Sequence, residues 1–192
     1  MIGNDVVDLG DPESRAEARH PRFDGRVFDE TERVLIDATP EPERVRWLLW
    51  AAKESAYKAA RKEDPRTVFA PSRFHVRREA DPGLTVSIGE RRFRVDVVVG
   101  AEHVHAVARG ASDPPAAVCS AVGTLPELAT GSDVVRRLAI ARLSRLLGIA
   151  PDDIAIRRDG RIPALWLRGR RSPADLSLSH HGRFVAFACT LP

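Results

Sequence analysis

Carboxylates near the start of the chain form the first of three segments whose residue types suit metal and phosphate chemistry. Asp5 and Asp8 follow Gly3 in a short run that is rich in valine. Mg²⁺ takes one or two protein carboxylates and completes its shell with phosphate oxygens and water. Charged strand ends without a function are also common, so this segment needs support from elsewhere in the chain.

The second segment, Trp50 to Ala59, lies in a stretch with helical periodicity. Trp50, Glu54 and Lys58 recur about one turn apart and therefore share one helix face. Glu54 could bind a metal ion or accept a proton, and Lys58 could bind a phosphate. The alternative is an ordinary Glu–Lys pair at i,i+4, worth about 0.3 kcal/mol.

The lysines of the chain are few and clustered. Against 27 arginines there are three lysines, Lys53, Lys58 and Lys62, and all of them fall within ten residues. Lysine carries a compact, mobile charge that can lose its proton, so it is not equivalent to arginine. The clustering favours a specific need for ammonium groups in this part of the chain.

The third segment contains Ser177, Ser179 and His180. Strand alternation places the two serines on one face, with His180 at the end of the strand. Hydroxyl groups and an imidazole suit phosphate binding. His180 and His181 are adjacent and would point to opposite faces, which argues against a shared zinc ion. A polar turn is the alternative interpretation.

Hydrophobic periodicity, caps and turn residues predict the elements that would position these segments. Helices are predicted over residues 29–37, 39–62 and 132–147. Strands are predicted over 2–9, 72–79, 84–88, 91–99, 103–109, 153–158, 161–167, 175–179 and 183–189. Residues 110–131 resemble a loop with one short apolar run and mark a boundary between two units, 1–112 and 113–192. This order predicts the α+β class.

Composition and charge exclude several classes of protein. No apolar stretch is long enough to span a bilayer, the first residues lack the features of a signal peptide, and two lone cysteines make neither a disulfide scaffold nor a thiolate zinc site. We therefore expect a cytoplasmic protein with no membrane partner. Residues 132–192 carry a net charge of +6 and residues 1–62 a net charge of −2, which suggests a polyanion opposite an acidic, metal-binding edge.

Together, the three segments resemble the motifs of the 4′-phosphopantetheinyl transferase superfamily. These motifs are G-x-D with a nearby acid, W-x-x-K-E-A/S-x-x-K, and a strand that ends in S-x-S-H. The middle motif is the most specific, and five of its residues fall in register: Trp50, Lys53, Glu54, Ser55 and Lys58. Residues 159–163 also look like the family's G-K-P hairpin, with Arg161 in place of lysine and an inserted Ile162. The resemblance implies a fold of two pseudo-symmetric units, each with a long helix packed on a small, mainly antiparallel sheet.

The order of the motifs resembles a rearranged member of the family. In the double-unit branch, of the surfactin-synthetase-activating type, the unit with S-x-S-H precedes the unit with G-x-D. Here it follows, and residues 132–192 resemble that leading unit. We interpret the chain as a circular permutant, which predicts that residues 1 and 192 are neighbours in space. The second acid of the double-unit branch falls on Val7, whereas Asp8 sits one residue further, as in the single-unit branch.

The resemblance implies transfer of the phosphopantetheine arm of coenzyme A to a serine of an apo acyl or peptidyl carrier protein, with Mg²⁺ as cofactor and 3′,5′-ADP as product. It implies Asp5, Glu54 and Lys58 as catalytic residues, with Asp5 and Glu54, and optionally Asp8, as metal ligands. The implied contacts to coenzyme A come from Lys58, Ser179, His180, Arg161 beside the 3′-phosphate, and Arg142 as a further candidate.

Two alternatives remain open. A non-catalytic module could keep the fold and bind a carrier protein or coenzyme A. A basic DNA-binding regulator is the second, because residues 142–149 look like the first half of a helix-turn-helix, although a hairpin rather than a recognition helix is predicted after them. We expect no nucleic-acid partner, and two units in one chain favour a monomer.

Overall fold

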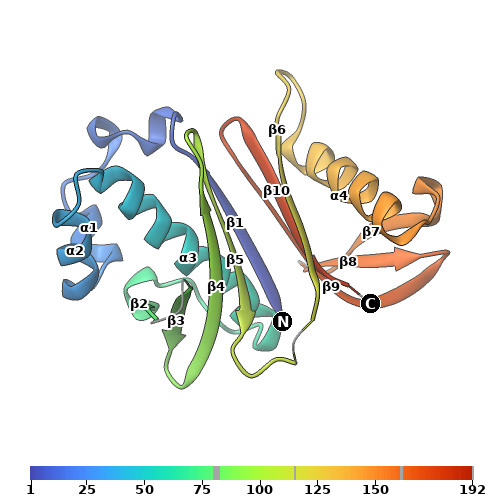
Figure 1. Cartoon of the computed structure of the whole chain (residues 1–192), viewed down its shortest axis with the longest axis horizontal. Helices are drawn as coiled ribbons and strands as arrows, with labels where there is room; N and C mark the ends of the chain where they lie inside the picture. The colour runs from blue at the N-terminus through green and yellow to red at the C-terminus, as the bar shows by residue number, and fades with distance from the viewer. Residues whose placement is uncertain (80–82, 115, 161, 192) are drawn as a thin grey trace.

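The computed structural model describes residues 1–79, 83–114, 116–160 and 162–191, and it contains two units with the same order of elements (Figure 1). Each unit runs strand, helix and then four strands. The first contains β1 (Ile2–Asp8), α3 (Pro42–Glu63), β2 (His75–Arg78), β3 (Leu84–Ile88), β4 (Arg91–Val99) and β5 (His103–Gly110). The second contains β6 (Val118–Thr124), α4 (Gly131–Leu147), β7 (Ile154–Asp159), β8 (Ile162–Leu167), β9 (Arg170–His181) and β10 (Phe184–Thr190).

Strand order establishes the pseudo-symmetry. The first sheet has the order β1-β5-β4-β3-β2 and the second has the order β6-β10-β9-β8-β7, and all the strand pairs are antiparallel. Numbered within its own unit, each sheet therefore has the order 1-5-4-3-2. The predicted α+β fold with two pseudo-symmetric units is confirmed. The predicted boundary between residues 112 and 113 falls between β5 and β6 and stays a prediction.

The first unit carries extra short helices between β1 and α3. These are two 3-10 turns (Pro12–Ser14 and Ala16–Ala18), α1 (Phe23–Val27) and α2 (Glu30–Asp37). Helix α2 begins with the predicted capping box: Asp29 Oδ1 accepts from the Glu32 N–H, and Glu32 Oε2 accepts from the Asp29 N–H. Two further 3-10 turns, Pro71–Arg73 and Pro151–Asp153, precede β2 and β7.

Helix α3 packs closely on β1 because both surfaces are small. Ala52, Ala56 and Ala59 are fully buried on the helix face that meets the sheet. Opposite them, a Cβ added to Gly3 would lie 2.0 Å from the Ser55 carbonyl oxygen and 2.7 Å from the Ala59 nitrogen. Glycine at position 3 is therefore required by the close approach of helix and strand.

The structure differs from the sequence predictions at several boundaries. Strand β6 lies inside the segment predicted to be a loop, because its short apolar run follows two prolines and gives only a weak strand pattern. Helix α3 starts at Pro42 instead of at Thr39-Pro40, and helix α4 is capped by Thr130 rather than by Ser132 or Asp133. Strand β9 starts at Arg170, five residues before its predicted start.

A ladder of side chains joins the two units. The outward N–H groups of β1 at Ile2, Asn4, Val6 and Asp8 donate to Asp175 Oδ2, Ser177 Oγ, Ser179 Oγ and His181 Nδ1 of β9, at 2.6, 2.9, 3.3 and 3.1 Å. Every second residue takes part, since side chains alternate along a strand. Side chains of β9 thus accept hydrogen bonds from the N–H groups on the edge of β1 that faces away from β5.

Apolar contacts and an ion pair add to this joint. Ile2 packs against Ala188, and Val6 packs against Phe184 and Ala186 of β10. Lys62 of α3 pairs with Asp175 at 2.6 Å and also donates to the carbonyls of Ile2 and Leu176. The two units therefore share one continuous buried interface.

The two described chain ends contact residues that are close together in the sequence, Asp113 and Ala117. The Met1 ammonium group pairs with Asp113, and the Leu191 N–H donates to the Ala117 carbonyl at 2.8 Å. The permutation hypothesis concerns residue 192, which lies outside the described residues. Among the described residues, no helix combines the length and the apolar character that crossing a bilayer requires.

Candidate functional site

A pocket of about 390 Å³ opens where β1 and α3 of the first unit meet β9 of the second. Residues from both units line it, and these include Asp5, Glu54, Lys58, Ser179 and His180, five of the predicted site residues. Aromatic side chains form another part of the wall, from Trp47, Trp50 and Phe69. The structure thus brings together motifs that lie more than 170 residues apart in the sequence.

Asp5 is held by one residue from each unit. Its Oδ1 accepts from Lys58 Nζ at 2.8 Å and from the Ser179 hydroxyl at 2.9 Å. No described residue donates a hydrogen bond to Oδ2 of Asp5. Lys58 Nζ also lies 3.0 Å from the Asn4 carbonyl and 3.3 Å from Ser179 Oγ. One oxygen of the carboxylate is therefore fixed, and the other is available to a ligand.

Glu54 lies one helical turn before Lys58 on the same wall of the pocket. Burial raises the pKa of its carboxyl to about 7; Lys58 opposes that rise and the Asp5 carboxylate adds to it. A carboxyl with a pKa near 7 exchanges its proton readily at neutral pH. Glu54 is therefore suited to accept or donate a proton in the pocket.

Asp5 and Glu54 together fit a hard divalent cation. Their free atoms are carboxylate oxygens, which are the protein ligands that Mg²⁺ prefers. Asp5 raises the pKa of Glu54, so the two negative groups lie close enough to repel each other. A cation bound by both would remove that repulsion, and no described residue donates a hydrogen bond to the Glu54 carboxylate in its place.

Asp8 is not brought into this group. Strand alternation turns Asp5 toward α3 and Asp8 toward the turn between β9 and β10. There its oxygens accept from the N–H groups of Gly10 and Arg183 and from Nε and Nη2 of Arg183, at 2.8–2.9 Å. These bonds occupy the acceptor positions of the carboxylate, and the Arg183 guanidinium holds the pKa of Asp8 far below its usual range.

The three clustered lysines have separate tasks. Lys53 is fully buried away from the pocket, where its Nζ pairs with Glu32 at 2.7 Å and donates to the carbonyls of Val27 and Pro71. Burial lowers the pKa of Lys53. Lys53 thus attaches α3 to α2 and to the segment before β2, and Lys62 attaches it to the second unit. Only Lys58 of the three lines the pocket.

A second pocket of about 400 Å³ shares His180 and Leu178 with the first. Basic and hydroxyl groups line it, from Ser132 and Arg136 at the start of α4 and from Arg158 of β7. Arg136 and Arg158 were not predicted as site residues, since one arginine among 27 carries no distinguishing pattern. The exposed His180 therefore connects a carboxylate pocket to a basic one.

Of the two arginines predicted to bind coenzyme A, Arg142 is not found at this second pocket. Arg142 lies further along α4, where its guanidinium approaches the Cys119 thiol and partly offsets the burial that raises the pKa of Cys119. Arg161 lies outside the described residues. Its neighbour Gly160 adopts a φ of 61°, as expected at the predicted hairpin turn between β7 and β8.

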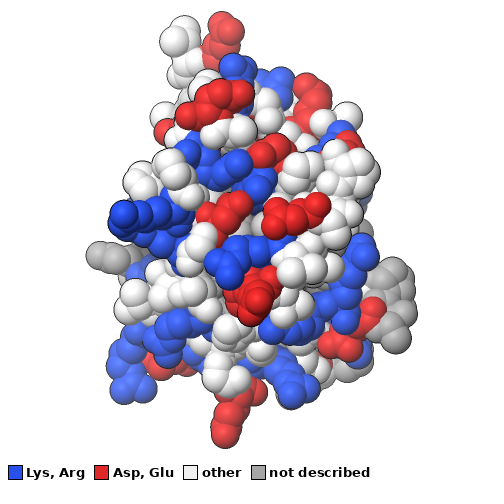
Figure 2. Space-filling model, turned by 90° about the vertical axis from the view of Figure 1, so that its left-hand side faces the viewer, with Lys and Arg blue, Asp and Glu red and all other residues white. Residues whose placement is uncertain are grey.

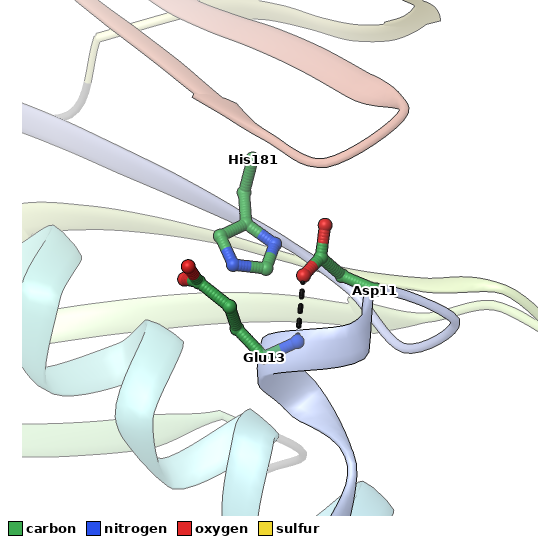
Figure 3. A group of neighbouring side chains, drawn as sticks. All are labelled: Asp11, Glu13 and His181. Atoms are coloured by element: carbon green, nitrogen blue, oxygen red, sulfur yellow. Dashed lines mark hydrogen bonds between the residues drawn. The ribbon is translucent and has the colours of Figure 1, made fainter. Parts of the chain in front are cut away.

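Asp11, Glu13 and His181 form a further group of potential metal ligands (Figure 3), with ligand atoms within 4.8 Å of one another. The Asp8 N–H donates to His181 Nδ1 at 3.1 Å. In the neutral ring the proton must then sit on Nε2, which leaves no free nitrogen lone pair for a cation. We therefore assign no metal site to this group.

The acidic excess of residues 1–62 does not form a one-sign patch on the face that carries α1 and α2. Figure 2 shows basic and acidic side chains interspersed there. In the same part of the chain, Arg19 and Arg46 form ion pairs with Asp24 and Glu43. The pocket that contains Asp5 and Glu54 and the pocket that contains Arg136 and Arg158 still differ in the charges that line them.

A comparison with models of protein families agrees with the motifs. The family model for the 4′-phosphopantetheinyl transferase superfamily matches residues 1–119. Among solved structures, the chain is similar to the holo-acyl-carrier-protein synthase (AcpS) of Thermotoga maritima, with 11% sequence identity and a TM-score of 0.45 over 88% of this chain and 83% of that one. No curated protein sequence gives a significant match.

Proposed function

The chain belongs to the 4′-phosphopantetheinyl transferase superfamily, and on that premise we propose that it transfers the 4′-phosphopantetheine group of coenzyme A to a serine of an apo acyl or peptidyl carrier protein. The reaction is Mg²⁺-dependent and releases 3′,5′-ADP. One observation carries the proposal: Asp5 and Glu54 of the first unit share a pocket with His180 of the second.

The bond changes require a base and charge stabilisation, but no nucleophile from this chain. The serine Oγ of the carrier forms a bond to the phosphorus that bears pantetheine. The bond from that phosphorus to the oxygen of the leaving 3′,5′-ADP breaks, and the serine proton goes to the Glu54 carboxylate. Glu54 lines the pocket and has no hydrogen-bond donor on its carboxylate among the described residues, so it can receive this proton.

Asp5 and Glu54 would hold the Mg²⁺ ion. When bound there, the ion neutralises the charge that develops on the pyrophosphate oxygens. Lys58 fixes Asp5 and adds a positive charge to the same wall. Its contact to Ser179 Oγ, at 3.3 Å, is the longest of its three, and a phosphate oxygen could replace it.

The nucleotide end of coenzyme A fits the basic pocket beyond His180. Arg136 and Arg158 supply guanidinium groups, which bind phosphate through paired N–H donors. His180 lines both pockets and would therefore contact phosphate between them. Arg161 stays a proposed ligand of the 3′-phosphate, and the position of Arg142 makes it the weakest member of the set.

Mass spectrometry of apo carrier proteins tests this function. Incubation with the protein, coenzyme A and Mg²⁺ should add the mass of phosphopantetheine to at least one carrier, and a chelator should prevent the addition. A protein that binds coenzyme A but modifies none of a broad panel of carriers would instead be a non-catalytic module. The helix-turn-helix alternative lacks its second helix among the described residues, since a 3-10 turn and β7 follow α4.

A further inference from the structure

Ser179 forms a contact between the units that the proposed function does not use. The inference rests on the proposed function, and the family resemblance implied that Ser179 contacts coenzyme A. In the structure its hydroxyl donates to Asp5 Oδ1, with 2.9 Å between the two oxygens. From the geometry, we infer that Ser179 is a positioning residue that orients Asp5 for metal binding and does not bind the nucleotide.

The hydrogen-bonding capacity of the Ser179 hydroxyl supports this role. A hydroxyl has one donor and two acceptor positions. The donor goes to Asp5, and the two acceptor positions receive the Val6 N–H and Lys58 Nζ, both at 3.3 Å. A phosphate oxygen accepts hydrogen bonds and needs a donor. Ser179 could offer one only by releasing Asp5.

The hydrogen bonds to one carboxylate oxygen of Asp5 fix the direction of the other oxygen. Ser179 and Lys58 both bind Oδ1, so the carboxylate cannot turn freely about its Cβ–Cγ bond. Oδ2, which no described residue contacts through a hydrogen bond, is then presented in a fixed direction in a pocket that Glu54 also lines. Fixing a ligand through a second residue commonly changes metal affinity by 10- to 100-fold.

Ser177 provides a matched control on the same strand. It is equally buried, and its hydroxyl accepts from the Asn4 N–H at 2.9 Å in the same ladder. No hydrogen bond joins Ser177 to Asp5 among the described residues. Any general effect of removing a hydroxyl from this interface should therefore appear in Ser177→Ala as well as in Ser179→Ala.

Two binding measurements that need no turnover separate the roles. Electron paramagnetic resonance gives the affinity of the whole protein for Mn²⁺ alone, and calorimetry with a chelator present gives its affinity for 3′,5′-ADP. We expect Ser179→Ala to weaken Mn²⁺ binding about tenfold and to leave 3′,5′-ADP binding within about twofold of the wild type. Ser177→Ala should change neither affinity. Ser179→Thr, which keeps the hydroxyl, should restore most of the Mn²⁺ affinity.

The opposite pattern would overturn the inference. If Ser179→Ala, folded by circular dichroism, loses 3′,5′-ADP affinity, Ser179 is a nucleotide ligand, whether or not Mn²⁺ binding also falls. If Ser179→Ala does not fold, Ser179→Thr decides, because a threonine hydroxyl that fails to preserve Mn²⁺ affinity also contradicts the role. The proposed function can fail separately, since a protein that modifies no carrier could still show the expected Mn²⁺ pattern.

Discussion

Arg183 and Asp8 form a two-pronged ion pair between the two units. Nη2 of Arg183 lies 2.8 Å from Oδ1 of Asp8, and Nε lies 2.9 Å from Oδ2. Asp8 ends the first strand, and Arg183 lies in the turn between the last two strands. This pair therefore links the two units at the end of β1, and the Lys62–Asp175 pair links them near the start of β1.

Replacing Asp8 with asparagine should destabilise the fold at neutral pH. The Arg183 guanidinium lowers the pKa of folded Asp8 well below the 3.8 expected of a free aspartate. The stabilisation that the Asp8–Arg183 pair contributes is therefore complete above about pH 4, and it is lost as the pH falls further. Urea unfolding at pH 7 should show Asp8→Asn to be about 2 kcal/mol less stable than the wild type.

The difference in unfolding free energy between Asp8→Asn and the wild type should become smaller in acid. Asp37→Asn, at an exposed position in α2, serves as the control and should stay within about 0.5 kcal/mol of the wild type. If the Asp8→Asn variant is as stable as the control at pH 7, the Asp8–Arg183 pair contributes little to the interface between the units.

Because of His105, the free energy of unfolding should decrease as the pH is lowered from 6.5 to 4. Burial among the strands lowers the pKa of its imidazole from 6.5 to about 4. In that range the unfolded chain binds the proton and the folded chain does not, so protons favour unfolding as the pH falls. The full effect is on the order of 3 kcal/mol.

Denaturation curves collected between pH 7 and 4 test this assignment. His105→Gln should lose less stability over that range than the wild type, whereas His20→Gln, at an exposed position, should follow the wild type. Parallel profiles for all three proteins would contradict a neutral, buried His105.

Gly3→Ala should damage the packing of α3 on β1. The added Cβ would meet the Ser55 carbonyl oxygen at 2.0 Å, and backbone atoms there cannot move aside cheaply. We expect a loss of about 3 kcal/mol or failure to fold. Gly83→Ala is the matched control, because a Cβ at position 83 meets nothing within 4 Å. Similar melting temperatures for the two variants would contradict the close approach.

Lys53→Met should show the cost of an unpaired buried charge. Lys53 and Glu32 are both fully buried and pair at 2.7 Å, so the change leaves the Glu32 carboxylate without its cation. A loss of about 3–5 kcal/mol in unfolding free energy is expected. Adding Glu32→Gln should recover part of that loss, because it removes the stranded charge. Losses that simply add in the double variant would rule out this coupling.

The residues of the carboxylate pocket could largely be predicted from the sequence. Helical spacing places Trp50, Glu54 and Lys58 on one face, and the structure finds all three on one wall. The same kind of reasoning separates Asp5 from Asp8, because residues three apart on a strand point to opposite faces. Only one of the two aspartates can therefore face Glu54, but the strand pattern alone does not say which, and Asp8 stayed among the expected metal ligands.

The remaining features depend on how distant elements pack. The ladder between β1 and β9 needs the two strands side by side, and no local pattern reports that placement. The pairing of Lys53 with Glu32 could not be predicted for the same reason. The two residues are 21 positions apart in the sequence, and only the packing of α2 on α3 brings them together. Strand β6 was missed because an edge strand with few buried residues has little hydrophobic pattern.

Carrier modification by Glu54→Gln tests the central claim most directly. Glutamine keeps the shape of Glu54 but can neither accept the serine proton nor give a charged ligand to the cation. With coenzyme A and Mg²⁺, mass spectrometry should show a phosphopantetheine-modified carrier for the wild type and for Glu63→Gln, an exposed change on the same helix, and at least a 1,000-fold slower reaction (about 4 kcal/mol) for Glu54→Gln. A folded Glu54→Gln protein that modifies the carrier at the wild-type rate would contradict the account.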